Sequence, residues 1–201
     1  LIWQRLKKYK AYCASDLNEI FQPGQVRRNS RNLIENSDLS CYPKTVSGKL
    51  KSVGELSEIA AQARAKRKTV VFTNGCFDLL HRGHVHMLRE AKAQGDLLIV
   101  AMNSDSSVKA IKGPRRPIMP EIDRVELIAA MEMVDYVVVY DEPDPYDLIA
   151  AIKPNVLAKG GDWSPDKIIG ADIVERDGGR VAVIPYLQGF STTEIIERIK
   201  T

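Results

Sequence analysis

The strongest constraint on the fold is an alternation of short apolar runs with amphipathic segments that begins at Lys68. The apolar runs are typical of buried strands, and they cover residues 69–72, 97–102, 136–139, 156–158 and 181–184. Segments with helical spacing lie between them, near residues 84–93, 121–133, 145–152 and 165–176. Strands that alternate with helices in this way form a parallel sheet with right-handed crossovers.

We therefore expect an α/β fold of the Rossmann-like kind, a doubly wound parallel five-stranded sheet with helices on both faces. The first two runs and the last are apolar throughout, which predicts strands buried on both faces. Asp144-Pro145 predicts a helix start and Gly95 a helix end. Ligands of such sheets bind at the carboxyl ends of the strands, near the point where the strand order reverses.

Residues 1–48 differ in character from the rest of the chain. The first 51 residues hold ten basic and four acidic side chains, so the net charge of +3 originates there. Gln22-Pro23-Gly24 and the polar stretch 27–32 are typical of loops. We expect a basic, partly disordered extension or linker at 1–48, ahead of a catalytic domain at 49–201 that opens with a helix capped by Ser52 and Glu55. Nucleic-acid or membrane binding by the extension is the alternative.

Cysteine usage and hydropathy indicate the compartment. Cys13, Cys41 and Cys76 are widely spaced and form no CxxC pair, so neither a zinc site nor a disulfide framework is indicated. The longest apolar run, residues 97–102, is far too short to span a bilayer, and the start has no signal-peptide pattern. We expect a cytoplasmic protein that binds neither membranes nor nucleic acid. The missing initiator Met leaves open that the chain is a fragment or a processed product.

The segment from Thr73 to His84 joins the first expected strand to the helix that follows it. Gly75 lets the backbone turn and approach a ligand. The helix that starts near Gly83 points its free N–H groups and positive dipole end at the mouth of the sheet, which is a natural anion site. His81 and His84 are three residues apart across this helix start, so their rings can lie on one side. This arrangement suits attack on a phosphate, where catalysis is largely positioning and charge stabilisation.

A metal pair is the main alternative for these two histidines. A zinc site requires further ligands, and the nearby thiol of Cys76 would be the sole sulfur. We expect His86 to point elsewhere on the helix. The strand–loop–helix context favours phosphate.

Other segments supply groups that suit phosphate or an acceptor. Ser191, Thr192 and Thr193 place three hydroxyls at an expected helix N-terminus, where Ser191 and Glu194 also predict a capping box. The run Lys-Gly-Gly-Asp-Trp that starts at Lys159 follows a strand, where ligands bind, although an ordinary turn is the alternative.

The basic segment 109–118 predicts a flexible arm able to close on a triphosphate. Within it we expect Lys112 and Arg115 to meet phosphate, and Lys109 and Arg116 to be solvated surface residues. Arg124, on the following helix, is expected to face the same cleft.

Gly-Cys-Phe-Asp-Leu-Leu-His-Arg-Gly-His, which begins at Gly75, resembles the signature of the HxGH nucleotidylyltransferase superfamily. Glycerol-phosphate and choline-phosphate cytidylyltransferases and phosphopantetheine adenylyltransferase are members. The resemblance implies that His81 and His84 bind the triphosphate and stabilise the transition state, and Lys112 is our third catalytic candidate. The expected nucleotide-binding residues are Asn74, Gly75, Cys76, Phe77, Gly83, Arg115, Arg124, Ser191, Thr192 and Thr193. The expected substrate-binding residues are Asp78, Lys159, Asp162 and Trp163.

Four motifs occur here in the same order as in bacterial ADP-heptose synthases: Thr-Asn-Gly-Cys-Phe-Asp, Gly-Pro-x-Arg-Pro-Ile, Lys-Gly-Gly-Asp-Trp and Gly-Phe-Ser-Thr-Thr. The chain is similar to their adenylyltransferase domain from about Val53 to Lys200. This implies transfer of AMP from ATP, with Mg²⁺ bridging the triphosphate, to D-glycero-β-D-manno-heptose 1-phosphate for lipopolysaccharide core or surface glycan synthesis. Several cytidylyltransferases carry a basic residue shortly before Ser-Thr-Thr, and residues 186–188 have none, which favours the heptose branch. Trp163 stands where that branch usually has Tyr.

Partners and rival functions follow from the same resemblance. Bifunctional members carry a sugar kinase ahead of the transferase. Residues 1–48 are too short for a kinase, so we expect a separate sugar kinase upstream in the pathway. We also expect a homo-oligomer. The alternatives are a cytidylyltransferase acting on glycerol 3-phosphate or a similar alcohol phosphate, and a non-catalytic nucleotide sensor. No GxGxxG follows the first strand and no GxxxxGK[ST] occurs, which argues against a dehydrogenase and a P-loop enzyme.

Overall fold

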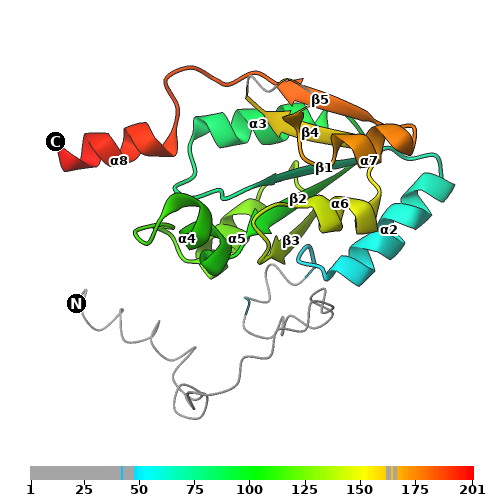
Figure 1. Ribbon diagram of the computed structural model, residues 1–201, viewed down its shortest axis with the longest axis horizontal. Coiled ribbons are helices and arrows are strands. Elements are labelled where there is room, and N and C mark those ends of the chain that lie inside the picture. Colours follow the sequence, from blue (N-terminus) through cyan, green and yellow to red (C-terminus); the bar gives the residue numbers. More distant parts are fainter. Residues whose placement is uncertain (1–41, 43–47, 162–163, 165–166) are drawn as a thin grey trace, which may run out of the picture. The chain divides into compact units, whose positions relative to one another are not determined.

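The structure, a computed structural model, describes residues 42, 48–161, 164 and 167–201. Five parallel strands form one sheet in the order β3-β2-β1-β4-β5 (Figure 1). The strands are β1 (Val70–Gly75), β2 (Leu97–Asn103), β3 (Tyr136–Tyr140), β4 (Val156–Gly160) and β5 (Arg180–Ile184). The helices are α2 (Val53–Ala65), α3 (Arg82–Lys92), α4 (Asp105–Lys112), α5 (Glu121–Ala129), α6 (Tyr146–Ile152), α7 (Ala171–Arg176) and α8 (Thr192–Lys200). The expected Rossmann-like fold is confirmed.

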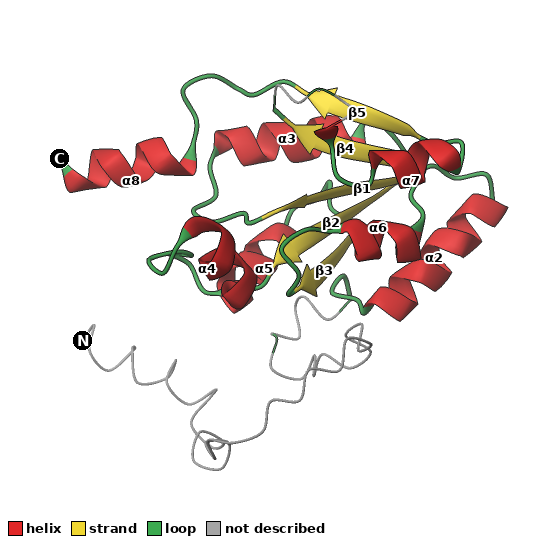
Figure 2. Cartoon of the chain, in the orientation of Figure 1, coloured by secondary structure: helices red, strands yellow, loops and turns green. Residues whose placement is uncertain are grey.

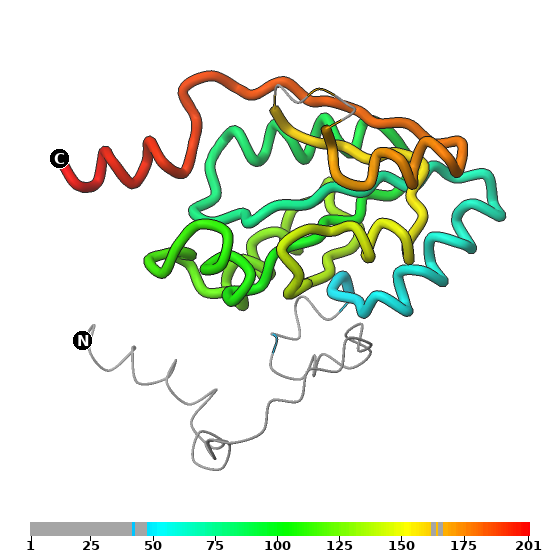
Figure 3. The backbone as a smooth tube through the Cα atoms, viewed as in Figure 1, coloured from blue at the N-terminus to red at the C-terminus, as the bar shows by residue number. Residues whose placement is uncertain are grey.

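The order of the strands determines where a ligand can bind. From β1 the chain steps outward to β2 and β3, then crosses back to the other side of β1 and adds β4 and β5 (Figure 3). The reversal lies between β1 and β4, which pair through Val71 and Val156. The carboxyl ends of both strands therefore meet at the switch point, where ligands of open α/β sheets bind.

Helices cover both faces of the sheet and enclose two apolar cores (Figure 2). Leu56 of α2, Ile149 of α6 and Ile173 of α7 pack on one face, and Leu88 of α3 and Ile128 of α5 pack on the other. Successive residues of β1 alternate between these cores, as the two-residue period of a strand requires. Each fully buried Leu or Ile contributes roughly 1.5–3 kcal/mol, so the sheet is a rigid support for the loops at its edge.

The domain opens as the sequence predicts. Ser52 caps α2: its hydroxyl accepts from the N–H of Glu55 at 3.3 Å, and its own N–H donates to the Glu55 carboxylate at 2.8 Å. Just before this cap, the N–H of Lys51 donates to the carbonyl of Val137 at 2.9 Å, which fixes the entry segment to β3. The predicted boundary at residue 48 falls beside residues outside the described part and stays a prediction.

Two predicted elements differ from the structure. Residues 109–112 belong to helix α4 rather than to a flexible arm, because Ser104 caps this helix by accepting from the N–H of Ser107 at 3.2 Å. Helix α5 ends at Ala129 rather than near residue 133. The N–H of Asp135 donates to the carbonyl of Leu98 at 3.1 Å, so the chain must already run alongside β2 there.

The last strand and the last crossover helix also differ. β5 is not buried on both faces, because it is an edge strand that pairs with β4 alone; Arg180 is exposed and residues 181–183 are half-buried. Helix α7 begins at Ala171, after a turn at Gly170, rather than near residue 165. Residues 165 and 166 lie outside the described part.

Candidate active site

A cavity of about 860 Å³ lies at the carboxyl end of the sheet. Its walls come from the β1–α3 loop, the end of α4 with the following loop, the ends of β3 and β4, and the β5–α8 segment. The cavity brings together most of the predicted site residues: Asn74, Gly75, Cys76, Phe77, Asp78, His81, Gly83, His84, Lys112, Lys159, Ser191, Thr192 and Thr193. Arg115 and Arg124 do not line it, and Asp162 and Trp163 lie outside the described residues.

The two histidines are held in one orientation by backbone groups at the start of α3. The Nδ1 of His81 accepts from the N–H of Gly83 at 3.1 Å, and the Nδ1 of His84 accepts from the N–H of His81 at 3.4 Å. The rings stack with centroids 3.8 Å apart. Because each Nδ1 accepts, the proton of each neutral imidazole is on Nε2. Both rings can therefore donate Nε2–H to an anion in the cavity.

Burial keeps these imidazoles neutral. It lowers the pKa of His84 to about 4, helped by the charge that His81 would carry. Burial also lowers the pKa of His81, although Glu194 opposes this. Neutral N–H donors attract negative oxygen without the cost of burying two adjacent cations. The pair is suited to hydrogen bonding with phosphoryl oxygens rather than to proton abstraction.

A tight turn connects β1 to α3. Phe77 and Leu79 have positive φ of 48° and 51°, an uncommon conformation for such side chains. Phe77 is buried and its ring lies 5.5 Å from that of His84. A Cβ at Gly83 would come within 2.9 Å of the His81 ring, so glycine is required for the histidines to stack.

The buried carboxylate of Asp78 forms an ion pair with the half-buried Arg116 at the rim of the cavity. The Nε of Arg116 donates to the Asp78 carboxylate at 2.6 Å, and the N–H groups of Ile118 and Met119 donate to it at 2.9 Å. Burial alone would raise the pKa of Asp78, but these three donors lower it. The expectation that Arg116 is a solvated residue is wrong. Asp78 secures the α4–α5 loop, while its role toward a substrate stays a prediction.

Arg124 lies beneath the cavity rather than in it, which corrects the expectation that it faces the cleft. Its side chain is 0% exposed. The guanidinium donates to the carbonyls of Cys76, Asn103 and Met119 at 2.6, 2.9 and 3.1 Å, and pairs with Asp105 at 2.8 Å. Arg124 therefore joins three loops that shape the site. The sequence could not show that its partners would be backbone carbonyls from distant segments.

The other basic candidates differ in position. Lys112 is exposed at the end of α4 and lines the cavity, as the sequence predicts. Arg115 is exposed on the loop that follows α4. Lys159, at the end of β4, is largely buried, and its Nζ donates to Oδ1 of Asn74 at 2.9 Å. Burial lowers the pKa of Lys159.

The hydroxyl segment lies where the sequence placed it. Ser191 caps α8 by accepting from the N–H of Glu194 at 3.1 Å. Among the described residues, the second bond of a capping box, from the N–H of Ser191 to the Glu194 carboxylate, is not formed. The hydroxyl of Thr192 donates to the carbonyl of Asp78 at 2.8 Å. The hydroxyls of all three residues are thus near the histidines, on the rim of one cavity.

Asn103 and Tyr140 are polar lining residues that the sequence did not single out. Both are the last residue of a strand, at the carboxyl edge where ligands bind. The apolar runs of the sequence stop one residue earlier, at Met102 and Val139, so hydrophobic periodicity does not include these polar ends. Position at the end of a strand was the available signal.

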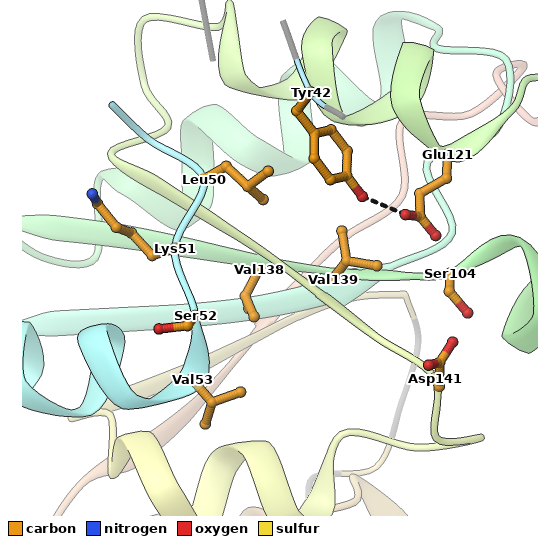
Figure 4. Close-up of a pocket in the computed structure, with 10 residues that line it drawn as sticks. All are labelled: Tyr42, Leu50, Lys51, Ser52, Val53, Ser104, Glu121, Val138, Val139 and Asp141. Carbon is orange, nitrogen blue, oxygen red and sulfur yellow. Dashed lines mark hydrogen bonds between the residues drawn. The ribbon is translucent and has the colours of Figure 1, made fainter. Parts of the chain in front are cut away.

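A second, smaller cavity of about 250 Å³ lies beside the edge strand β3 (Figure 4). Val138 and Val139 form part of its wall, and Tyr42 donates a hydrogen bond to Glu121 there. None of the predicted site residues that the structure describes lines it. A separate finding concerns membranes. Among the described residues, no helix combines the length and apolar character that crossing a bilayer requires.

Comparison with known proteins agrees with this geometry. The cytidylyltransferase-like family model matches residues 72–198. The bifunctional protein HldE of Trichlorobacter lovleyi is 53% identical over 151 residues, which are 75% of this chain and 31% of the relative. HldE of Syntrophotalea carbinolica is 49% identical over 177 residues, 88% of this chain and 36% of the relative. The chain thus spans about a third of the length of these curated relatives.

Two solved structures match part of this chain. The lipopolysaccharide core biosynthesis protein of Thermoplasma volcanium is 30% identical, with 60% of this chain and 97% of that chain covered and a TM-score of 0.48. Pantoate-beta-alanine ligase of Francisella tularensis is 15% identical, with 77% of each chain covered and a TM-score of 0.51, and it shows likeness of fold alone.

The cytidylyltransferase-like family match and the Rossmann-like sheet define a nucleotidyltransferase, an enzyme of the EC 2.7.7 type. The chain belongs to the cytidylyltransferase-like family.

Proposed function

We propose that the chain is an adenylyltransferase that joins AMP from ATP to D-glycero-β-D-manno-heptose 1-phosphate, giving ADP-heptose and pyrophosphate. The observation that carries this proposal is the stacked pair His81 and His84, whose Nε2 donors are free to face phosphate at the start of α3. The choice of heptose is supported by the four motifs quoted above and by the similarity to HldE. The product would serve lipopolysaccharide core or surface glycan assembly.

The reaction is a displacement at the α-phosphorus of ATP. An oxygen of the sugar phosphate forms a bond to that phosphorus, and the bond from phosphorus to the bridging oxygen of the β-phosphate breaks, so pyrophosphate leaves. His81 and His84 donate to the phosphoryl oxygens as charge spreads over them. In this scheme Thr192, Thr193 and Lys112, which line the same cavity, hold the departing pyrophosphate. No side-chain nucleophile is required.

Magnesium enters this scheme as part of the substrate, MgATP. The described residues contain no group of three or more His, Cys, Asp or Glu side chains arranged to hold a metal ion. The Mg²⁺ ligands would then be mainly triphosphate oxygens and water, as is usual for this ion.

We propose that a sugar kinase supplies the heptose 1-phosphate.

The test is pyrophosphate release by the purified chain with Mg²⁺, pairing ATP and CTP each with heptose 1-phosphate and with glycerol 3-phosphate. Release with ATP and heptose 1-phosphate alone is the expected result. Release that requires CTP and glycerol 3-phosphate would overturn the substrate and favour a cytidylyltransferase. Binding of nucleotide without release from any pair would favour a sensor.

A further inference from the structure

The entry segment, which the structure describes at residue 42 and at 48–51, reaches helix α5 at both of its ends. At the start of α5, the hydroxyl of Tyr42 donates a hydrogen bond to the carboxylate of Glu121, the first residue of the helix (Figure 4). Just past the end of α5, the Nζ of Lys49 donates to the carbonyl of Met131 at 3.0 Å. Leu50 is 2% exposed and packs in the same core as α5. Two side-chain hydrogen bonds thus hold the entry segment on α5.

The carboxylate of Glu121 joins the starts of two helices. One oxygen accepts the hydrogen bond of Tyr42, and the other accepts from the N–H of Asp105 at 3.3 Å. Asp105 is the first residue of α4, so the carboxylate lies at the N-terminal end of α4 as well as in the first turn of α5. A negative charge is favourable at both places, because the free N–H groups and the positive dipole ends of the helices are there. Glu121 therefore fixes the start of α4 relative to α5.

From Asp105 the connection continues to the wall of the larger cavity. The Oδ1 of Asp105 pairs with the guanidinium of Arg124 at 2.8 Å. The same guanidinium donates to the carbonyl of Cys76 at 2.6 Å. Cys76 lines the cavity, on the loop that leads from β1 to His81. Successive polar contacts thus connect the entry segment to the loop that carries the first candidate catalytic histidine.

Burial makes Arg124 sensitive to the position of its carboxylate partner. Among the described residues, Asp105 is the one carboxylate that pairs with it. The guanidinium is fully buried, whereas the side chain of Asp105 is 37% exposed and is open to water. A buried cation whose partner moves away is left uncompensated, which is costly. A small displacement of Asp105 is therefore expressed at Arg124 and at the loop that Arg124 holds.

The tie at the other end of α5 leads away from the cavity. The carbonyl of Met131 that accepts from Lys49 also accepts from the N–H of Val134 at 3.2 Å, in the turn before β3. None of these three residues lines the larger cavity. Lys49 thus attaches the same segment next to the same helix as Tyr42 does, but without a connection to Arg124. The two ties provide a comparison between anchoring alone and anchoring that reaches the active site.

We propose that Tyr42 is a positioning residue for the active site, which holds the Cys76 loop in its reactive arrangement through the connection that ends at Arg124. The proposal rests on the function given above for the reaction that it affects. Tyr42 does not touch the substrate, because it lines the smaller cavity and not the larger one. The entry segment is then part of the support of the active site as well as the start of the domain.

The test variant is Tyr42→Phe, which keeps the ring and removes the hydroxyl, with Lys49→Met as its matched control. Each variant loses one hydrogen bond between the entry segment and α5, so both should lose a similar, small amount of stability in urea. In Tyr42→Phe, kcat/KM for AMP transfer should fall about threefold to tenfold, within the range that residues along such networks produce. In Lys49→Met it should stay within about twofold of the wild type. Equal activity of the two variants, whether reduced or unchanged, would overturn the proposal.

A double-mutant cycle tests the route through Glu121. Tyr42→Phe and Glu121→Gln both act on one hydrogen bond, so their effects on kcat/KM should not multiply. The double variant should be within about twofold of the more impaired single variant. Lys49→Met combined with Glu121→Gln should instead show independent effects, because the two residues lie at opposite ends of α5. Effects of Tyr42→Phe and Glu121→Gln that multiply would contradict the proposed route.

A measurement without turnover separates this proposal from the proposed function. Alkylation of the Cys76 thiol by iodoacetamide, followed by peptide mass, needs no substrate. The thiol is half-buried on the loop that Arg124 holds, so a loosened loop exposes it. The rate should rise about twofold to fivefold in Tyr42→Phe and match the wild type in Lys49→Met. If these rates differ as expected while no substrate pair gives turnover, the proposed function fails and the positioning role holds. Equal rates in all three proteins would overturn the positioning role.

Discussion

Two halves of the same cavity differ in how firmly they are held. The packed half comprises residues 76–78, 103–105 and 116–124, which the guanidinium of Arg124 and the carboxylate of Asp78 bind together. Both side chains are 0% exposed. The open half comprises residues 185–194. There Tyr186 is 65% exposed, Phe190 is 39% exposed, and α8 contributes no buried residue and projects beyond α3 (Figure 1).

The difference corresponds to two requirements of the reaction. Catalysis by positioning needs donors that are already fixed when the substrate arrives. Entry of nucleotide and release of pyrophosphate need a wall that can move, and such walls come from weakly packed segments. The packed half satisfies the first requirement and the open half the second. His81 and His84 lie at the start of α3, which contacts both: Phe77 on one side and, through Arg82, the ring of Phe190 on the other.

The largest effect should come from removing a donor that the packed half orients. His84→Ala should lower kcat by about 100- to 1000-fold, the value of one transition-state hydrogen-bond donor. The free energy of unfolding should change by no more than about 1 kcal/mol, because the ring is only half-buried. Steady-state kinetics and urea unfolding check both. His86→Ala, on the same helix but outside the cavity, is the control; comparable rates for the two variants would remove His84 from the mechanism.

The next largest effect should be on the free energy of unfolding, which should depend on Arg124 in the packed half. Arg124→Met removes a buried cation with four partners and should lower the free energy of unfolding by about 2–3 kcal/mol. Arg89→Met, an exposed change of the same type on α3, should alter it by less than about 0.5 kcal/mol. Urea denaturation measures both. If the two variants were equally stable, the packed half would not be held by Arg124.

The contrast between the halves also shows which parts of the fold and of the candidate site could be predicted from the sequence. The apolar alternation predicted the sheet, and the spacing of His81 and His84 predicted their meeting at a helix start, since both depend on residues close in the chain. The pairing of Asp78 with Arg116 lies 38 residues apart and depends on how the α4–α5 loop packs. A charged residue in a Gly-Pro loop looks solvated until that packing is known.

The same reason explains Arg124 and the polar residues at the strand ends that line the cavity. Arg124 has the helical spacing of a residue that could face a cleft, but its partners are carbonyls from three separate loops. Asn74, Asn103 and Tyr140 are single polar residues at the ends of different strands. Their meeting follows only from the strand order and register, which sequence periodicity does not give.

The histidines should also make stability depend on pH. Their folded pKa values lie below the unfolded value, so as pH falls from about 6.5 the unfolded chain binds protons that the folded chain does not, and stability is lost toward pH 4. Between pH 7 and 5 the wild type should lose about 1–2 kcal/mol more than His84→Asn. Urea midpoints at the two pH values measure this. Equal losses would mean that His84 is not held neutral.

The smallest effect should be found in the open half, at its bond to the packed half. Thr192→Val keeps the shape of the side chain and removes the hydroxyl that donates to the carbonyl of Asp78. The KM for ATP should rise about twofold to fivefold with kcat nearly unchanged, because one neutral hydrogen bond on a weakly packed wall is lost. Thr192→Ser retains the hydroxyl and should restore the wild-type KM. A fall in kcat comparable to that of His84→Ala would instead show that the open half is as preorganised as the packed one, and the comparison between them would no longer hold.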